Sequence, residues 1–433
     1  MSKILLFAHS GFSDQNANGL TIKNLLSAWQ PEEKAECYYD VQPPDFTAAA
    51  QYFRVTDMDV LKAMVGKQTQ HCFTAAPTME KTGAGSSRSR PLPVWLKKRN
   101  YHFGVKWLRE ILRMVSPWGR RKLAAWIREV NPDVIVYMVG ESLSLDRLVY
   151  RACQDTGKPL VLVNCEAFRV IDLRQRRGLD RAYYRHAEAW YEKLSRRASL
   201  VAYNCKMLQQ SYEQRYPDSP RGIITYNSAQ ACTVPYQPGP GPLTLTHFGN
   251  MGLNRVDSLL FLAQELGKLD GSLHLDVYGR TKIPEDEDRL CACPQIRFHG
   301  YVSAQELQQV IEKSDILFHV ESFDPVIQKL LHYAFSTKIA QCLCAGRCFV
   351  SYAPAGLAST QYLTETGGAV VVTDPAELHG QLEKLLTDPQ LRAECARRTL
   401  AVGQKNHRRE RTAQWFREQV EAIRPERRRQ NGA

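Results

Sequence analysis

Short apolar runs rich in β-branched residues alternate with longer segments of helical periodicity along most of the chain. Such an alternation is typical of parallel sheets covered by helices on both faces. The pattern predicts an α/β fold with strands at residues 4–8, 134–138, 160–164, 200–203 and 223–226, and again at 243–248, 273–277, 296–299, 316–320, 349–351 and 369–372.

A stretch rich in proline and glycine, at residues 235–242, separates the two series of strands. Each series predicts one Rossmann-like domain, and we expect the two domains to face each other across a cleft. We assign residues 1–232 to the first domain and 233–407 to the second. Residues 408–433 then form a C-terminal helix and a basic tail.

Composition places the chain among globular proteins. Of its 433 residues, 44% are hydrophobic and 24% are charged, and the longest apolar runs are far shorter than the ~20 residues that cross a bilayer. The first residues lack the basic segment and cleavage site of a signal peptide, so we expect a cytoplasmic protein. Its twelve cysteines are scattered, and we interpret them as reduced thiols rather than zinc ligands.

Much of the net charge of +12 is concentrated between Arg88 and Lys122, where eleven Lys and Arg accompany one glutamate. Three tryptophans and several leucines and isoleucines share this segment, and an interfacial helix on an anionic membrane has this combination. The membrane contacts would be Trp95, Lys97, Lys98, Arg99, Trp107 and Trp118. The pattern also fits a helix that packs on its own core. Because no nucleic-acid-binding module accompanies the charge, we expect no nucleic-acid partner.

Three further motifs are candidates for binding an anion such as a diphosphate. Gly19 lies in a turn just before the first predicted helix, and Gly252 and Arg255 lie between the strand at 243–248 and its helix. Arginine beside helix-start amides suits a diphosphate, because its donors add formal charge to the helix dipole. Further on, a strand ends at Glu321, and Ser336-Thr337-Lys338 opens a helix.

The segments from residue 243 to 407 resemble the donor half of GT-B glycosyltransferases, most closely the family 4 type of bacterial surface-polysaccharide assembly. The resemblance is fair over residues 1–29. It implies transfer of a sugar from a nucleotide-diphosphate donor to a membrane-associated, lipid-linked glycan acceptor, with retention of anomeric configuration. It also implies that neither a metal nor another cofactor takes part, and that the enzyme works at the inner face of the cytoplasmic membrane.

The resemblance also assigns site residues. Glu321 would contact the transferred sugar as a catalytic residue, and Tyr301 would lie beside the base. The diphosphate would be held by Gly19, Gly252, Arg255, Ser336, Thr337 and Lys338. The ribose-binding glutamate of the family is replaced by Gln341, and a second phosphate-binding lysine is absent, so donor binding departs from the family pattern.

Acceptor-side chemistry is expected where strands of the first domain end. Glu166 follows the strand at 160–164 and is the second catalytic candidate, with Glu141 as its rival. Two other functions remain open. A GT-B nucleotide-sugar epimerase would share the fold, and a non-catalytic glycan- or nucleotide-binding protein derived from a transferase would explain Gln341.

Overall fold

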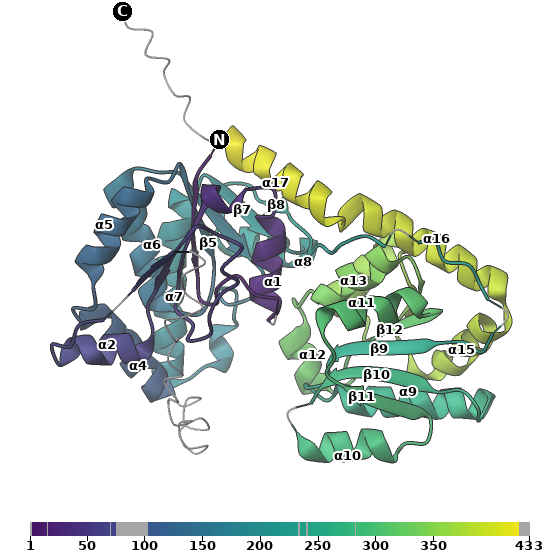
Figure 1. The fold of residues 1–433 in the computed structure, drawn as a ribbon. Coiled ribbons are helices and arrows are strands. Elements are labelled where there is room, and N and C mark those ends of the chain that lie inside the picture. Colours follow the sequence, from purple (N-terminus) through teal and green to yellow (C-terminus); the bar gives the residue numbers. More distant parts are fainter. Residues whose placement is uncertain are drawn as a thin grey trace, which may run out of the picture. The chain divides into compact units, whose positions relative to one another are not determined.

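The computed structural model describes residues 2–14, 16–69, 71–74, 103–232, 234–239, 241–281 and 283–423. These residues form two compact α/β units (Figure 1). The N-terminal unit takes the described residues of Met1–Tyr203, Leu208–Ile224 and Trp415–Ala433, and the C-terminal unit takes those of Asn204–Met207 and Thr225–Gln414.

The N-terminal unit is built on an eight-stranded sheet in the order β4-β3-β2-β1-β5-β6-β7-β8. Neighbouring strands are parallel except β3 and β4. Their bounds are β1 Ile4–Ala8, β2 Lys34–Tyr38, β3 Gln51–Arg54, β4 Cys72–Thr74, β5 Val134–Met138, β6 Leu160–Asn164, β7 Leu200–Tyr203 and β8 Ile223–Ile224. The five strands that the sequence predicted here are present, and β2, β3 and β4 are additional.

Strand β2 shows why the apolar pattern missed part of this sheet. It is buried along its whole length although it contains Lys34 and Glu36. The Glu36 carboxylate accepts from the Phe12 amide at 3.1 and 3.2 Å, and burial raises the pKa of Glu36 to about 8. Two ionisable side chains inside this buried strand interrupt the apolar run that normally marks such a strand.

Helices cover this sheet and include the last helix of the chain. They are α1 Ala17–Leu25, α2 Asp57–Met64, α4 Phe103–Val115, α5 Arg120–Val130, α6 Leu143–Thr156, α7 Gly178–Arg197, α8 Lys206–Arg215 and α17 Arg409–Ala422, with short turns η1 Pro31–Glu33 and η3 Leu173–Gln175. In α17, Phe416 and Val420 are buried in the core of the N-terminal unit, and Phe416 meets the Trp29 ring edge-on. No helix in the described ranges has the length and apolar content needed to cross a membrane.

The C-terminal unit contains a fully parallel six-stranded sheet in the order β11-β10-β9-β12-β13-β14. All six strands were predicted, and their bounds are β9 Leu245–Asn250, β10 Leu275–Arg280, β11 Ile296–Gly300, β12 Ile316–Val320, β13 Cys348–Tyr352 and β14 Val370–Val372. The order of the strands reverses between β9 and β12, and ligands of such sheets bind at the carboxyl ends of strands at this point.

Helices lie on both sides of the C-terminal sheet: α9 and α10 on one side, α11 and α13 on the other (Figure 1). The full set is α9 Arg255–Leu269, α10 Pro284–Ala292, α11 Ala304–Lys313, α12 Pro325–Leu331, α13 Thr337–Ala345, α14 Ala358–Thr366, η4 Pro375–Glu377, α15 Leu378–Thr387 and α16 Pro389–Asn406. Helix α12 occupies the segment between Glu321 and α13.

The chain passes into the C-terminal unit at Thr225, earlier than the predicted division after residue 232. The connecting segment is already hydrogen-bonded there: the side-chain amide of Asn227 donates to the Phe335 carbonyl at 2.8 Å, and the Cys232 backbone N–H donates to the Cys344 carbonyl at 2.8 Å. These bonds tie the segment ahead of the proline-rich stretch to the C-terminal unit.

Candidate active site

The end of β9 brings the backbone of the C-terminal unit close to α13. Gly249 has a φ of +117°, and a β-carbon at this position would lie 2.6 Å from Cδ of Lys338. Glycine is therefore needed both for the backbone conformation and for the approach of the lysine. The loop then turns through Gly252, whose N–H donates to Oδ1 of Asn250 at 2.9 Å, before α9 begins at Arg255.

Arg255 forms a bidentate ion pair with Glu321, at the carboxyl end of β12. Arg255 Nε lies 2.7 Å from Glu321 Oε2, and Nη2 lies 3.1 Å from Oε1. The remaining guanidinium nitrogen donates to the Gly252 carbonyl at 3.0 Å. Only 8% of Arg255 and 4% of Glu321 are exposed. Two residues with separately predicted roles, at the diphosphate and at the sugar, are thus one buried pair.

Lys338 places a second cation beside this pair. Ser336 caps α13, and its hydroxyl accepts from the Lys338 N–H at 3.3 Å. The Nζ atom of Lys338 is buried and makes no hydrogen bond within the described structure. Burial and the Arg255 charge lower the pKa of Lys338 to about 8, and Glu321 offsets only part of that shift. The site therefore contains a buried cation that lacks a hydrogen-bonded counter-ion.

Two buried histidines that the sequence analysis did not single out lie near Arg255, Glu321 and Lys338. His247 in β9 and His319 in β12 are 0% and 1% exposed. His247 Nδ1 lies 3.1 Å from the Phe318 carbonyl, and His319 Nε2 lies 3.4 Å from Glu321 Oε1. Burial, together with the charges of Lys338 and Arg255, holds the pKa of both imidazoles well below the ordinary value. They are neutral near pH 7, and the presence of a histidine inside each predicted strand was the available signal.

The other predicted donor residues occupy the same helix or the same edge of the sheet. Gln341 is half-buried one turn after Lys338 on α13, and Thr337 is the first residue of that helix. Tyr301 follows β11, is 58% exposed, and has the Arg280 guanidinium 3.8 Å from its ring centre. Arg280 ends the neighbouring strand β10 and was not predicted.

Gly19, the remaining predicted donor residue, belongs to the N-terminal unit. Its N–H donates to Oδ1 of Asn16, the N-cap of α1, at 2.6 Å. A β-carbon on Gly19 would lie 2.6 Å from the Gly11 carbonyl oxygen and 2.8 Å from the Ser13 nitrogen. Packing of the loop thus requires glycine here, and its contact with a donor stays a prediction.

Glu166 and Glu141 follow the adjacent parallel strands β6 and β5 of the N-terminal unit. Glu141 Oε2 pairs with Nζ of Lys106 at 2.9 Å, and the same ammonium lies 4.5 Å from the ring centre of Tyr183. Burial, and to a lesser extent the Glu141 charge, raises the pKa of Glu166. A carboxyl with a raised pKa at the carboxyl edge of a parallel sheet fits the acceptor side of such a site.

The structure describes only some of the residues predicted to contact a membrane. Trp95, Lys97, Lys98 and Arg99 lie outside the described residues. Trp107 is half-buried: its ring meets that of Tyr183 edge-on at 5.5 Å, and its indole N–H donates to the Leu179 carbonyl at 3.0 Å.

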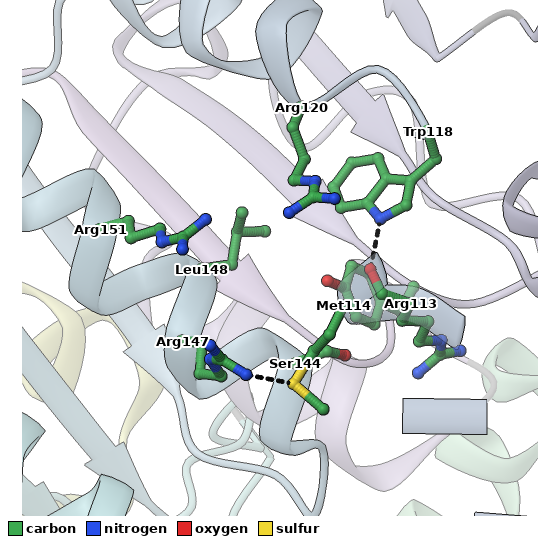
Figure 2. Close-up of a pocket in the computed structure, with 9 residues that line it drawn as sticks. Arg113, Met114, Trp118, Arg120, Ser144, Arg147, Leu148 and Arg151 are labelled. Carbon is green, nitrogen blue, oxygen red and sulfur yellow. Dashed lines mark hydrogen bonds between the residues drawn. The ribbon is translucent and has the colours of Figure 1, made fainter. Parts of the chain in front are cut away.

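The prediction that Trp118 contacts a membrane is wrong. The residue is 2% exposed, and its indole N–H donates to the Arg113 carbonyl at 2.7 Å (Figure 2). The helical periodicity of the segment was predicted correctly, but Trp118 belongs to the protein core.

Comparison with known proteins agrees with this geometry. Residues 259–418 match the model of a family described as glycosyl transferase-like. Among solved structures, HepE of Anabaena in complex with UDP superposes with a TM-score of 0.64 at 13% identity, covering 97% of this chain and 100% of that one. The lipopolysaccharide outer core galactosyltransferase WaaB gives 0.54 at 12% identity, covering 96% and 99%.

A third similar structure is that of a protein from Listeria monocytogenes described as a UDP-N-acetylglucosamine 2-epimerase. Its TM-score is 0.55 at 9% identity, and the alignment covers 98% of this chain and 96% of that one. A search of curated proteins finds no match.

The fold is thus GT-B, with two parallel-sheet units of the Rossmann type. The prediction of the fold class is confirmed, and the glycosyl transferase-like match over 259–418 supports the predicted enzyme class.

Proposed function

We propose that the protein transfers a sugar from a nucleoside diphosphate donor to a membrane-associated glycan acceptor, with retention of anomeric configuration. The observation that supports binding of a nucleotide donor is the buried Nζ of Lys338, which lies beside the Arg255–Glu321 pair and lacks a hydrogen-bonded partner. A diphosphate would give this cation the counter-charge that the described residues do not supply. UDP is the first candidate nucleotide, because the similar HepE structures contain UDP and UDP-glucose.

Different residues of the described site bind the diphosphate, the ribose and the base of the donor. Lys338 and the first turn of α13 bind the diphosphate, because the helix N-terminus adds its dipole to the lysine charge. Gln341, one turn further on, offers an amide oxygen to the ribose hydroxyls. Tyr301 offers an aromatic face to the base. These groups and Arg255 belong to the chain itself, so we propose donor binding without a metal or another cofactor.

Glu321 is the proposed catalytic contact with the transferred sugar. Its bidentate pairing with Arg255 holds the carboxylate in place at the carboxyl end of β12. An ionised carboxylate stabilises the positive charge that develops at a sugar ring during transfer. Arg255 thereby positions Glu321 and adds positive charge next to the diphosphate.

Glu166 is the proposed contact with the acceptor. Its raised pKa makes it a better proton acceptor than an ordinary glutamate, and such a group can orient an attacking sugar hydroxyl. The lipid-linked nature of the acceptor, and work at the inner face of the cytoplasmic membrane, rest on the resemblance to surface-polysaccharide enzymes. WaaB, whose name describes a lipopolysaccharide galactosyltransferase, is structurally similar and supports the same choice.

The proposal is tested by nucleotide release from a panel of UDP-, GDP- and dTDP-sugars, in the presence and absence of bacterial membrane extract. We expect extract-dependent release from one nucleotide class. Lys338→Met should strongly reduce that release at limiting donor, whereas Lys405→Met, which changes an exposed lysine of the same unit, should leave it unchanged. Absence of release from every donor would refute the proposal.

A nucleotide-sugar epimerase is the second candidate, because the described epimerase from Listeria shares the fold over most of both chains. It would alter the sugar of a soluble nucleotide donor without needing membrane extract. Chromatography of the sugar products separates the two: transfer gives a labelled glycan, whereas epimerisation gives an isomeric sugar in solution.

A further inference from the structure

Helix α4 is amphipathic, but it buries its charged face instead of its apolar face. Lys106 pairs with Glu141 at 2.9 Å. One turn on, Glu110 is 0% exposed and accepts from the Ser144 N–H at 2.7 Å. Arg113 is 3% exposed and pairs with Asp57 of α2 at 2.6 Å. The residues at 106, 110 and 113 thus form a polar seam against the rest of the N-terminal unit.

The opposite face of α4 is apolar and exposed. The exposed fractions of Val105, Leu108, Ile111 and Val115 are 38, 56, 43 and 60%. Their spacing of three or four residues puts them on one stripe of the helix. A soluble helix normally turns this stripe to its core, so the inward polar seam leaves the apolar stripe without a partner in the described structure.

Helix α2 extends this apolar surface. It lies beside α4 (Figure 1), and Ser116, just after α4, donates its hydroxyl to the Val60 carbonyl at 2.8 Å. Four apolar residues at the outer side and end of α2 are exposed by 46 to 70%: Met58, Leu61, Met64 and Val65. Exposed apolar residues on two adjacent helices mark an interaction surface.

A rim of cations adjoins the ends of both helices. A surface pocket of about 590 Å³ lies between the end of α2 and the start of α5, with Lys67, Arg120, Arg121 and Lys122 in its wall. Arg120 also lines a second, smaller pocket, of about 40 Å³, together with Arg147 and Arg151 of α6 (Figure 2). No carboxylate is among the residues that line either pocket, so both favour anions.

We infer that this surface, formed by α2, α4 and the start of α5, docks the N-terminal unit on an anionic phospholipid bilayer. The apolar stripe would enter the boundary between headgroups and acyl chains, and the cations of the two pockets would bind lipid phosphates. The inference deepens the proposed function, on which it rests for the choice of a membrane-associated acceptor, and it moves the contact from Trp107 and Trp118 to different residues.

Charge and apolarity together favour a bilayer over the other occupants. Nucleic acid would bind the cations but has no use for exposed leucine, isoleucine and methionine side chains. A second copy of the chain, docked symmetrically, would bring the cations of the two copies against each other. An anionic bilayer supplies phosphates and acyl chains side by side, in the arrangement that the protein surface complements.

The test is sedimentation of the full chain with vesicles of phosphatidylcholine alone or of an equimolar mixture with phosphatidylglycerol. We expect binding to the mixed vesicles that weakens with salt. Arg121→Glu/Lys122→Glu should lower the partition coefficient at least roughly 25-fold, because each Lys or Arg near an anionic surface contributes roughly fivefold. Leu108→Glu/Ile111→Glu should lower it at least roughly tenfold, since both residues would otherwise be buried in the interface.

Matched controls come from exposed residues of the C-terminal unit. Val234→Glu and Arg397→Glu/Lys405→Glu make the same chemical changes elsewhere and should bind vesicles like the wild type. Equal binding by all four variants would overturn the inference. So would a wild-type chain that ignores vesicles, or one that forms a dimer which Leu108→Glu/Ile111→Glu dissociates.

Calorimetric titration of each protein with UDP, without lipid, separates this inference from the proposed function. Unchanged UDP binding with lost vesicle binding identifies a docking defect alone. Wild-type protein that binds mixed vesicles but neither UDP nor another nucleoside diphosphate would support docking and refute the proposed function.

Discussion

Replacing Lys338 by methionine should have opposite effects on stability and on nucleotide binding. The pKa of Lys338 falls from its ordinary value of 10.5 to about 8, and each pKa unit corresponds to about 1.4 kcal/mol. The buried charge therefore costs the folded protein about 3 kcal/mol at pH 7. Methionine has a similar length and no charge, so we expect the C-terminal unit of Lys338→Met to unfold roughly 6–12 °C higher.

The same substitution should weaken UDP binding roughly 10- to 150-fold, because a charged hydrogen bond contributes about 1.5–3 kcal/mol. A bound diphosphate should raise the pKa of Lys338, so wild-type affinity should fall as the pH rises above about 8, the pKa of Lys338 in the free protein. The variant should lack this pH dependence. Its stability advantage, in contrast, should be full below about pH 8 and vanish as the pH approaches 10.5, where the unfolded lysine also loses its proton.

Scanning calorimetry measures the stability, and isothermal titration calorimetry at several pH values measures the affinity. Lys405→Met is the control, because it removes an exposed lysine of the same unit and should change neither quantity. If Lys338→Met lowered the stability and bound UDP as the wild type does, the ammonium would be a partnered structural group, and the reasoning would be refuted.

Three further substitutions probe the neighbouring groups. Arg255→Ala should destabilise the C-terminal unit by about 3–5 kcal/mol, because Glu321 is left as a buried unpaired charge; urea unfolding should show most of this loss restored in Arg255→Met/Glu321→Leu. Gln341→Glu should preserve or improve donor use, and Gln341→Leu should impair it by leaving ribose hydroxyls unpaired; equal nucleotide release by all three proteins would remove Gln341 from the site. Glu141→Gln should lower the pKa of Glu166, because a negative neighbour is removed; an unchanged carboxyl titration in carbon-13 NMR would show that the two groups do not interact.

The C-terminal unit could be predicted strand by strand because short runs rich in apolar residues recur there between segments of helical periodicity. Parallel strands place their carboxyl ends at one edge, so Arg255, Glu321 and Lys338 could be expected near one another. The bidentate pairing of Arg255 with Glu321 could not, because spacing along the sequence says nothing about which donors a side chain meets. His247 and His319 were missed for a related reason, since the sequence of a strand does not say which charged groups will lie beside its histidine.

The N-terminal unit was less predictable because charged residues are buried in it. Lys34 and Glu36 conceal the central strand β2, as described above. In α4 the helical periodicity was visible, but periodicity alone does not say which face turns inward. Glu110 has buried partners at the start of α6, and the buried Arg113 pairs with Asp57 of α2. Those tertiary contacts outweigh the usual preference for burying the apolar stripe.

Transfer of labelled sugar from UDP-glucose and other nucleoside diphosphate sugars to lipid-extractable glycan, followed alongside nucleotide release, tests the proposed function most directly. We predict equal amounts of nucleotide and labelled glycan from one donor class with the wild-type protein, the same with Lys405→Met, and neither product with Glu321→Gln. Labelled glycan formed equally by Glu321→Gln, or nucleotide bound without any sugar transferred by the wild type, would contradict the assignment of this site as a glycosyltransferase centre.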